Sequence, residues 1–354
     1  MTKSYKLKAV AAVAGVFAAL VASAPANAYV YSVSKLEIKD LDINVYATGT
    51  KVDISAASNY TFNLTNTAKF QPLGGSTLID TQANGCQGNV LASAGPIFTT
   101  CSKVSPVLDA LVANAPGLLS ARADNNFAVL GSSPVKSYSN ADSQVTTAKL
   151  VQGGKTNTVQ IAESLLNTNG SATANTEVKS TTTLVTNLAI QGGTKADVDI
   201  SFASLLTLNG AIADLFNGIY TSSAGANVSI SLSKNGSNQS WTWSPDGSGA
   251  GQACQFSGGG IAGSTCKVLV NDGNLNVTDS RSSNPDSYND NFGAFKNFGL
   301  LISNLSSGLY SLSLQATTTT SVDRLAIPEP GSVALVGLAL GGLGFASKRR
   351  SRKQ

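Results

Sequence analysis

The chain has 354 residues, of which 42% are hydrophobic and 12% charged, and its formal net charge is +4. So many apolar residues with so little charge exclude a chain that is disordered throughout. Histidine is absent, which excludes Ser-His-Asp and Cys-His catalysis and histidine-based zinc or copper sites.

The positive charge lies at the two ends of the chain. Of the 24 lysines and arginines, three lie before residue 9 and five after residue 347, whereas 19 of the 20 acids lie between residues 29 and 327. That central body therefore carries about three net negative charges. It lacks the basic footprint that nucleic acids require, so we expect no nucleic-acid partner.

Residues 1–28 have the pattern of a signal peptide. Three lysines precede the apolar run Ala9–Ala22, and Ala26 and Ala28 form a small-x-small cleavage site. The pattern predicts export and a mature chain that begins at Tyr29. An uncleaved anchor is the alternative.

Alternating hydrophobicity near the start of the body predicts β-strands. Leu36 and Ile38 alternate with polar residues, and Leu41, Ile43 and Val45 resume the alternation after a slip of one residue at Asp40. The slip indicates a β-bulge.

Further strands are expected over residues 182–202 and 309–322. Residues 227–244 predict a hairpin with a turn at Asn235-Gly236 and with Trp241 and Trp243 on one face of the return strand. Core packing is the expected role of both tryptophans, and a sugar-stacking platform is the alternative.

The predicted fold class is mainly β, with an antiparallel sandwich or a jelly-roll-like body over residues 29–326 and a few short helical insertions. The segments that favour helix are 105–114, 158–166 and 209–216. Weak similarity between residues 49–55 and 193–201 leaves open two related halves with a boundary near 150–180.

Four cysteines lie in the body: Cys86, Cys101, Cys254 and Cys266. Three pairings are compatible with the sequence, and pairing each cysteine with its nearer neighbour is the simplest. An exported chain meets an oxidising compartment, which favours disulfides over free thiols. No CxxC spacing supports a metal site.

The body offers little for catalysis. It has three glutamates, no spacing that marks a pair of catalytic carboxylates, and no phosphate-binding glycine motif. We therefore expect no enzyme and no cofactor.

Two groups of oxygen-bearing side chains are candidates for a calcium site. One is Asp40, Asp42 and Asn44, and the other is 271–274 with Asn276 and Asp279. A solvated strand face and an Asn/Gly turn are the simpler interpretations.

The C-terminal region has three parts in order. Pro328, Glu329 and Pro330 come first; an apolar stretch over 331–347, about 25 Å long as a helix, follows. The basic residues Lys348, Arg349, Arg350, Arg352 and Lys353 then predict a cytoplasmic end to a membrane-spanning helix.

This arrangement over residues 327–354 resembles the PEP-CTERM sorting domain of surface proteins of Gram-negative bacteria. The resemblance implies export across the inner membrane, transient anchoring there, and cleavage by an exosortase, a membrane-embedded cysteine protease. It also implies a final place at the cell surface or in an exopolysaccharide or biofilm matrix.

The predicted function is accordingly structural or adhesive, with exosortase as the processing partner and extracellular polysaccharide as a candidate ligand. Two alternatives stay open. One is a secreted carbohydrate-active enzyme with Asp-based chemistry, which requires paired carboxylates in a cleft. The other is a permanently anchored periplasmic binding or sensor protein, which requires an uncleaved C-terminus.

Overall fold

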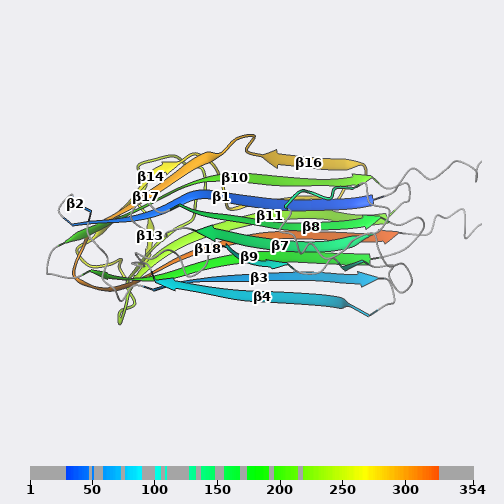
Figure 1. Ribbon diagram of the computed structural model, residues 1–354. Coiled ribbons are helices and arrows are strands. Elements are labelled where there is room, and N and C mark those ends of the chain that lie inside the picture. The colour runs from blue at the N-terminus through cyan, green and yellow to red at the C-terminus, as the bar shows by residue number, and fades with distance from the viewer. Residues whose placement is uncertain are drawn as a thin grey trace, which may run out of the picture.

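The structure is a computed structural model that describes residues 29–47, 50–51, 59–72, 76–89, 100–104, 108–109, 127–132, 137–147, 155–167, 174–190, 195–213 and 218–326. All regular secondary structure in these residues is β. The strands form two sheets, every strand pair is antiparallel, and the sheets lie face to face as a sandwich (Figure 1). The predicted mainly β sandwich is thus confirmed.

The larger sheet has the strand order β14-β17-β10-β1-β8-β7-β5, with β16 paired to β10, β2 to β1 and β6 to β7. Its strands are β1 (Tyr29–Ala47), β2 (Thr50–Lys51), β5 (Thr100–Val104), β6 (Leu108–Asp109), β7 (Tyr138–Thr147), β8 (Thr156–Asn167), β10 (Ala196–Ala213), β14 (Thr265–Asn271), β16 (Asp286–Asn291) and β17 (Lys296–Leu305).

The smaller sheet has the order β13-β12-β11-β18-β9-β3-β4, with β15 paired to β11. Its strands are β3 (Asn59–Pro72), β4 (Leu78–Asn89), β9 (Ala174–Ile190), β11 (Gly218–Lys234), β12 (Ser240–Trp243), β13 (Gln255–Ser257), β15 (Val277–Arg281) and β18 (Gly308–Ala326).

The first and last described residues lie at one end of the sandwich, which we call the terminal pole. Tyr29 opens β1 opposite Ala213, and Ala326 closes β18 opposite Gly218 (Figure 1). The opposite end, the distal pole, carries the turn after Lys234. The 17 residues of β11 separate the poles by about 55 Å at 3.3 Å per residue.

The predicted bulge is confirmed. The pairing of β1 with β10 shifts register between Lys39 and Asp42, and Asp40 has a φ of 52°. Ile38 before the bulge and Leu41 after it are both buried in the core. Without the extra residue, the side chains that follow the bulge would point to the opposite face of the sheet.

The predicted hairpin is also confirmed. β11 pairs with β12, with Ile230 opposite Trp243, and Gly236 in the turn has a φ of 74°. The last strand, expected over 309–322, is β18.

The prediction of short helical insertions is wrong for the segments that the structure describes. Residues 158–166 lie in β8, and residues 209–213 lie in β10. The spacing of Ile161, Leu165 and Leu166 imitates a helix because both faces of β8 are buried here, which removes the alternation of an ordinary strand. Most of segment 105–114 lies outside the described residues, but Leu108–Asp109 is a strand.

Apolar packing fills the distal half of the interior. A continuous cluster of buried side chains joins both sheets there, with Phe202 and Phe298 stacked at 5.0 Å between ring centroids. A second, smaller apolar cluster closes the interior at the terminal pole, and it consists of Val30, Phe70, Leu166, Ile212, Tyr220 and Val322.

Between these clusters lies a belt of small buried polar side chains that bond from sheet to sheet, which we call the polar belt. The side chains that form hydrogen bonds between the sheets include Ser32, Ser34, Asn66, Ser139, Ser143, Ser164, Ser180, Ser222 and Thr320. Ser34 Oγ donates to the carbonyl of Gly225 at 2.8 Å, and Asn66 Nδ2 donates to Ser143 Oγ at 2.9 Å. Because the serine side chain is short, its hydroxyl can reach a backbone carbonyl of the opposite sheet only where the two sheets lie close together.

One long side of the sandwich is held by a disulfide. Cys86 on β4 bonds to Cys101 on β5, with 6.1 Å between Cα atoms, and these strands belong to different sheets. The disulfide therefore links the two sheets near their edges.

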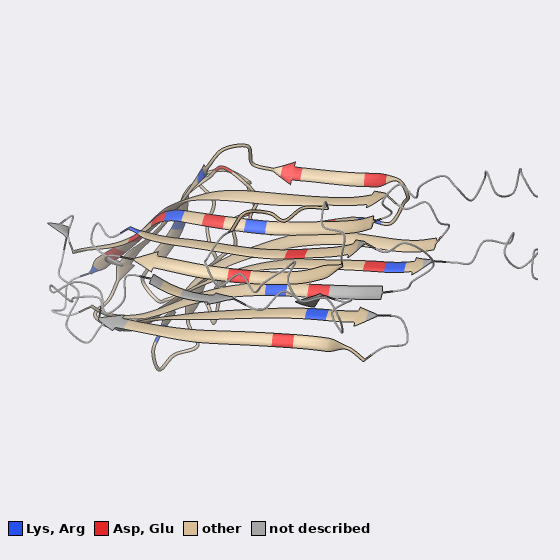
Figure 2. Ribbon diagram, turned by 45° about the vertical axis from the view of Figure 1, so that its right-hand side comes forward, with Lys and Arg blue, Asp and Glu red and all other residues tan. Residues whose placement is uncertain are grey.

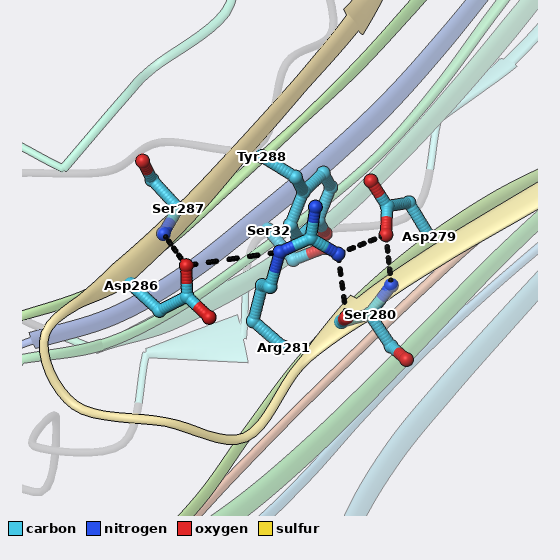
Figure 3. A network of polar contacts seen from close by, with 7 residues as sticks. All are labelled: Ser32, Asp279, Ser280, Arg281, Asp286, Ser287 and Tyr288. Carbon is cyan, nitrogen blue, oxygen red and sulfur yellow. Dashed lines mark hydrogen bonds and ion pairs between the residues drawn. The ribbon is translucent and has the colours of Figure 1, made fainter.

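A polar network closes the other side, where β15 of the smaller sheet leads into β16 of the larger one. Arg281 forms ion pairs with Asp279 and Asp286, and its guanidinium lies 5.4 Å from the centre of the Tyr288 ring (Figure 3). The Tyr288 hydroxyl lies 2.9 Å from Ser32 Oγ, inside the sandwich. Gly210 makes room for this ring, since a Cβ there would lie 2.2 Å from it.

Candidate functional site

The candidate binding surface lies toward the distal pole, on β12, β13 and the glycine-rich loops that follow them. Two of these glycines are required by close contacts. A Cβ on Gly258 would lie 2.3 Å from the Asn238 carbonyl oxygen, and one on Gly260 would lie 3.1 Å from the Trp241 ring. Both have φ above 60°, a conformation that glycine adopts without strain.

The loops are anchored to the larger sheet. Cys254 bonds to Cys266 on β14, with 5.5 Å between Cα atoms. The backbone of Val268 donates to the Gln252 carbonyl at 2.9 Å and accepts from Gly251 N at 2.8 Å. The pairing of each cysteine with its nearer neighbour is thus confirmed for both disulfides. The loop surface is held at a fixed place on the sandwich.

The two predicted tryptophans belong to the edge of the core. Trp243 is 5% exposed and lies 6.5 Å from the Phe202 ring, which confirms core packing. Trp241 is half-buried, packs against the same cluster, and donates from Nε1 to Ser264 Oγ at 2.9 Å.

The exposed aromatic residue of this surface is Phe256, which the sequence did not single out. Its side chain is 63% exposed and meets Trp241 edge-on, with 5.8 Å between ring centroids. Pairing of β12 with β13 places Phe256 directly opposite Trp241. A phenyl ring supported by an indole and surrounded by Ser, Gln and Gly can pack against the apolar face of a sugar ring.

The residues around 271–279 use their polar atoms within the fold. Asn271 Nδ2 donates to Asp246 Oδ1 at 2.8 Å, and Asn276 Oδ1 accepts from Val228 N at 3.0 Å. Hydrogen bonds to Asp246, first among them that of the Ser248 hydroxyl, lower the pKa of its carboxyl. Asp279 pairs with Arg281. This second group is organised as a hydrogen-bonded turn.

The structure divides the group Asp40, Asp42 and Asn44. Asp40, at the bulge, forms an ion pair with Lys155 at 3.1 Å. Asp42 accepts a hydrogen bond from Asn44 Nδ2 at 2.9 Å, on the part of β1 that pairs with β10. Among the residues that the structure describes, no three acidic or cysteine side chains gather closely enough to form a metal site by themselves.

A buried carboxylate on the outer face of the larger sheet was not expected from the sequence. Glu163 on β8 is fully buried, and it accepts hydrogen bonds from Gly131 N at 2.8 Å, Leu130 N at 3.1 Å and the Tyr31 hydroxyl at 2.7 Å. Burial raises the pKa of Glu163, and these hydrogen bonds oppose the shift. The carboxylate fixes residues 127–132 on the sheet.

Charged residues occur singly along the described strands rather than as a band of one sign (Figure 2). Together with the negative body, this distribution gives the described surface no basic stripe for a phosphate backbone.

The predicted signal-peptide residues Ala26 and Ala28 and everything from residue 327 onward lie outside the described residues. These include the motif 328–330, the apolar stretch 331–347 and the basic end. In the described part of the chain, no helix is long and apolar enough to cross a membrane.

Comparison with known proteins gives one informative match, at the C-terminus. A search of curated proteins found no match. Among solved structures, one titled "Structure of infectious bursal disease virus Gx strain" aligns with 10% identity over 89% of this chain and 87% of that one. Its TM-score is 0.08, so the alignment carries no argument about fold or function.

The informative match covers residues 326–350, which fit the family described as the PEP-CTERM protein-sorting motif. It starts at the last residue of β18, so the sorting segment follows directly from the terminal pole. The chain therefore carries a PEP-CTERM sorting motif, which implies an exported protein that is anchored in the membrane before an exosortase processes it.

Proposed function

We propose that this protein is a non-catalytic structural or adhesive component of the cell surface or extracellular matrix, and that its distal surface contacts polysaccharide. After processing by an exosortase, the sandwich is released or transferred from the inner membrane. Its final place is an exopolysaccharide or biofilm matrix.

One observation carries the proposal: Ala326, from which the sorting segment continues, and the exposed aromatic surface lie toward opposite ends of the sandwich. Residues 326–350 continue from the terminal pole, whereas Phe256 lies beside the distal part of β11, near Leu232. Leu232 is 14 residues along the strand from Gly218, or about 45 Å. Anchoring at one end thus leaves the other free for a matrix ligand.

The chemistry of the distal surface suits a neutral sugar. Its polar groups are mostly hydroxyls and amides, with Phe256 as the exposed apolar contact and Trp241 beneath it. Sugars bind through hydrogen bonds and through contact of their C–H faces with aromatic rings, and neither needs a charged site.

A non-catalytic role is supported by the way the acidic residues are used. The buried carboxylate of Glu163 is held by three donors from the fold, and Asp246 accepts bonds from Ser248 and Asn271. A glycosidase needs two carboxyl groups facing each other across a sugar-binding cleft. Neither of these carboxyl groups is available for that purpose.

Affinity electrophoresis in gels that contain the bacterium's own exopolysaccharide tests whether polysaccharide is the ligand. Phe256→Ser should weaken the binding measured by retention at least about fivefold, which corresponds to about 1 kcal/mol of binding free energy. The matched control is Ile219→Ser, because Ile219 is 60% exposed and lies at the terminal pole. Equal retention of the two variants would contradict a ligand site at the distal pole.

Replacing Pro328, Glu329 and Pro330 with alanines tests the sorting step. The variant should stay in the inner membrane, whereas the unaltered chain reaches the surface or the medium. Normal release of the variant would show that the motif is not the operative signal.

A further inference from the structure

The outward face of β1 beyond the bulge, together with the facing part of β10, carries three oxygen-bearing side chains, Asp42, Asn44 and Asp199. In the pairing of β1 with β10, Asn44 lies opposite Asp199 and Asp42 lies opposite Ser201. Ile43 and Ile200 are buried in the core, so their neighbours Asp42, Asn44 and Asp199 share the other face. Directly opposed residues have Cβ atoms about 5 Å apart, which brings Asn44 and Asp199 within reach of one ligand.

The amide oxygen of Asn44 is buried without a partner. Asn44 is 7% exposed, its Nδ2 donates to Asp42 Oδ2 at 2.9 Å, and its Oδ1 has no hydrogen-bond partner. Rotating the amide by 180° would turn the oxygen toward the Asp42 carboxylate and lose that bond. A buried carbonyl-type oxygen without a partner destabilises the fold, so a ligand that binds this oxygen would stabilise it.

Asp199 contributes a negative charge that no ion pair neutralises among the described residues. Asp42, Asn44 and Asp199 therefore bring two carboxylates and an unpartnered buried amide oxygen to one face of the sheet.

We propose that Asp42, Asn44 and Asp199 bind a Ca²⁺ ion, with water completing its coordination. Calcium prefers oxygen ligands from carboxylates and amides and accepts an irregular shell, whereas Mg²⁺ requires near-ideal octahedral geometry. With two carboxylates and one amide, the site should bind in the range of extracellular calcium modules, about 10⁻⁴ to 10⁻³ M.

The ion would act where β1 has fewer strand partners. The pairing of β1 with β8 ends at Leu41, and beyond it β1 is paired with β10 and, at its last two residues, with the short β2. An ion held by Asp42, Asn44 and Asp199 would join β1 to β10 through side chains as well as backbone. Calcium outside the cell would then reinforce the sandwich after export.

Terbium luminescence tests the site, because Tb³⁺ occupies calcium sites and is sensitised by a nearby phenol. The full-length chain, purified in detergent, should give a Tb³⁺ signal that Ca²⁺ displaces. Tyr46→Phe should reduce this signal strongly while leaving the rise of Tm by Ca²⁺ intact. Asp199→Asn should abolish both.

The matched control is Asp290→Asn, an exposed acid on the neighbouring strand β16. At saturating Ca²⁺ the unaltered chain and Asp290→Asn should each gain about 2 °C or more in Tm, and Asp199→Asn should gain none. In EDTA, Asp199→Asn should melt higher than the unaltered chain because it removes a repelled charge.

Two results would overturn the proposal. One is an unaltered chain whose Tm is the same in Ca²⁺ and EDTA. The other is an Asp199→Asn variant that keeps the calcium-induced rise. Neither bears on the polysaccharide contact at Phe256, which is measured separately with its own control.

Discussion

The two halves of the sandwich are held together by different interactions. In the distal half, large apolar side chains such as Phe202, Trp243 and Phe298 fill the space between the sheets. In the half next to the terminal pole, serines, threonines and Asn66 form hydrogen bonds from one sheet to the other.

The difference shows that serine and threonine side chains can hold two sheets together by hydrogen bonds where large apolar side chains are absent. A hydroxyl such as that of Ser34 or Ser222 is short enough to let the sheets approach and still reaches a carbonyl of the opposite sheet. The sheets then bond to each other through backbone acceptors, which depends on correct register. Hydrogen bonds depend on distance and angle, whereas the hydrophobic contribution of the apolar half is non-directional.

The largest expected effect is in the apolar half. Trp243→Ala should lower the free energy of unfolding by about 3–5 kcal/mol, because it leaves a cavity beside Phe202. Phe256→Ala, a short distance away on the surface, should cost less than about 1 kcal/mol. Urea unfolding of the two variants measures the contrast, and similar losses would show that Trp243 is not a core residue.

Next in size is the disulfide between the two sheets. Replacing both Cys86 and Cys101 with serine should cost about 3 kcal/mol, as expected for closing a loop of 15 residues. Calorimetry of the double variant checks this value. A loss below about 1 kcal/mol would mean that the polar belt and the core hold the sheets together without the covalent link.

A smaller loss is expected in the polar belt. Asn66→Ala removes one hydrogen-bond partner from each of the Ser143 and Ser180 hydroxyls and should cost about 1–3 kcal/mol. A double-mutant cycle with Ser180→Ala should show coupling, because the two side chains are bonded at 2.6 Å. Additive losses would contradict a connected belt.

The smallest effect is a change in pH dependence. Because burial raises the pKa of Glu163 above its ordinary value of 4.5, the folded state binds this proton more tightly than the unfolded state. Its contribution to stability is full below about pH 4.5 and is lost as the pH rises through the folded pKa.

Glu163→Gln removes this titration, so the variant should gain stability relative to the unaltered chain as the pH rises through that window. Urea unfolding at a series of pH values measures the difference, with Glu177→Gln, an exposed glutamate on β9, as the control. A difference that stays constant with pH, or one of opposite sign, would show that Glu163 is not titrating in the folded protein.

The features that the sequence predicted are local ones. The slip at Asp40 predicted the bulge, Asn235-Gly236 predicted the hairpin, and the nearer-neighbour pairing of the cysteines was correct. Each depends on residues close together in the chain, where turn chemistry and alternation are readable.

The missed features depend on distant partners. Segment 158–166 resembled a helix because the opposite sheet covers one face of β8 and residues 127–132 help to cover the other. Asn44 and Asp199 are 155 residues apart, and only the register of β1 with β10 joins them. Phe256 is one aromatic in a glycine-rich stretch, and its exposure depends on where β13 pairs.

The intact mass of the protein, measured from cells and from the medium, shows whether the sandwich is exported on a sorting segment that is then removed. If the segment is removed, a released species should begin at Tyr29 and lack everything after about residue 330. A released or surface species that retains residues through Gln354 would contradict this removal and would favour a permanently anchored protein.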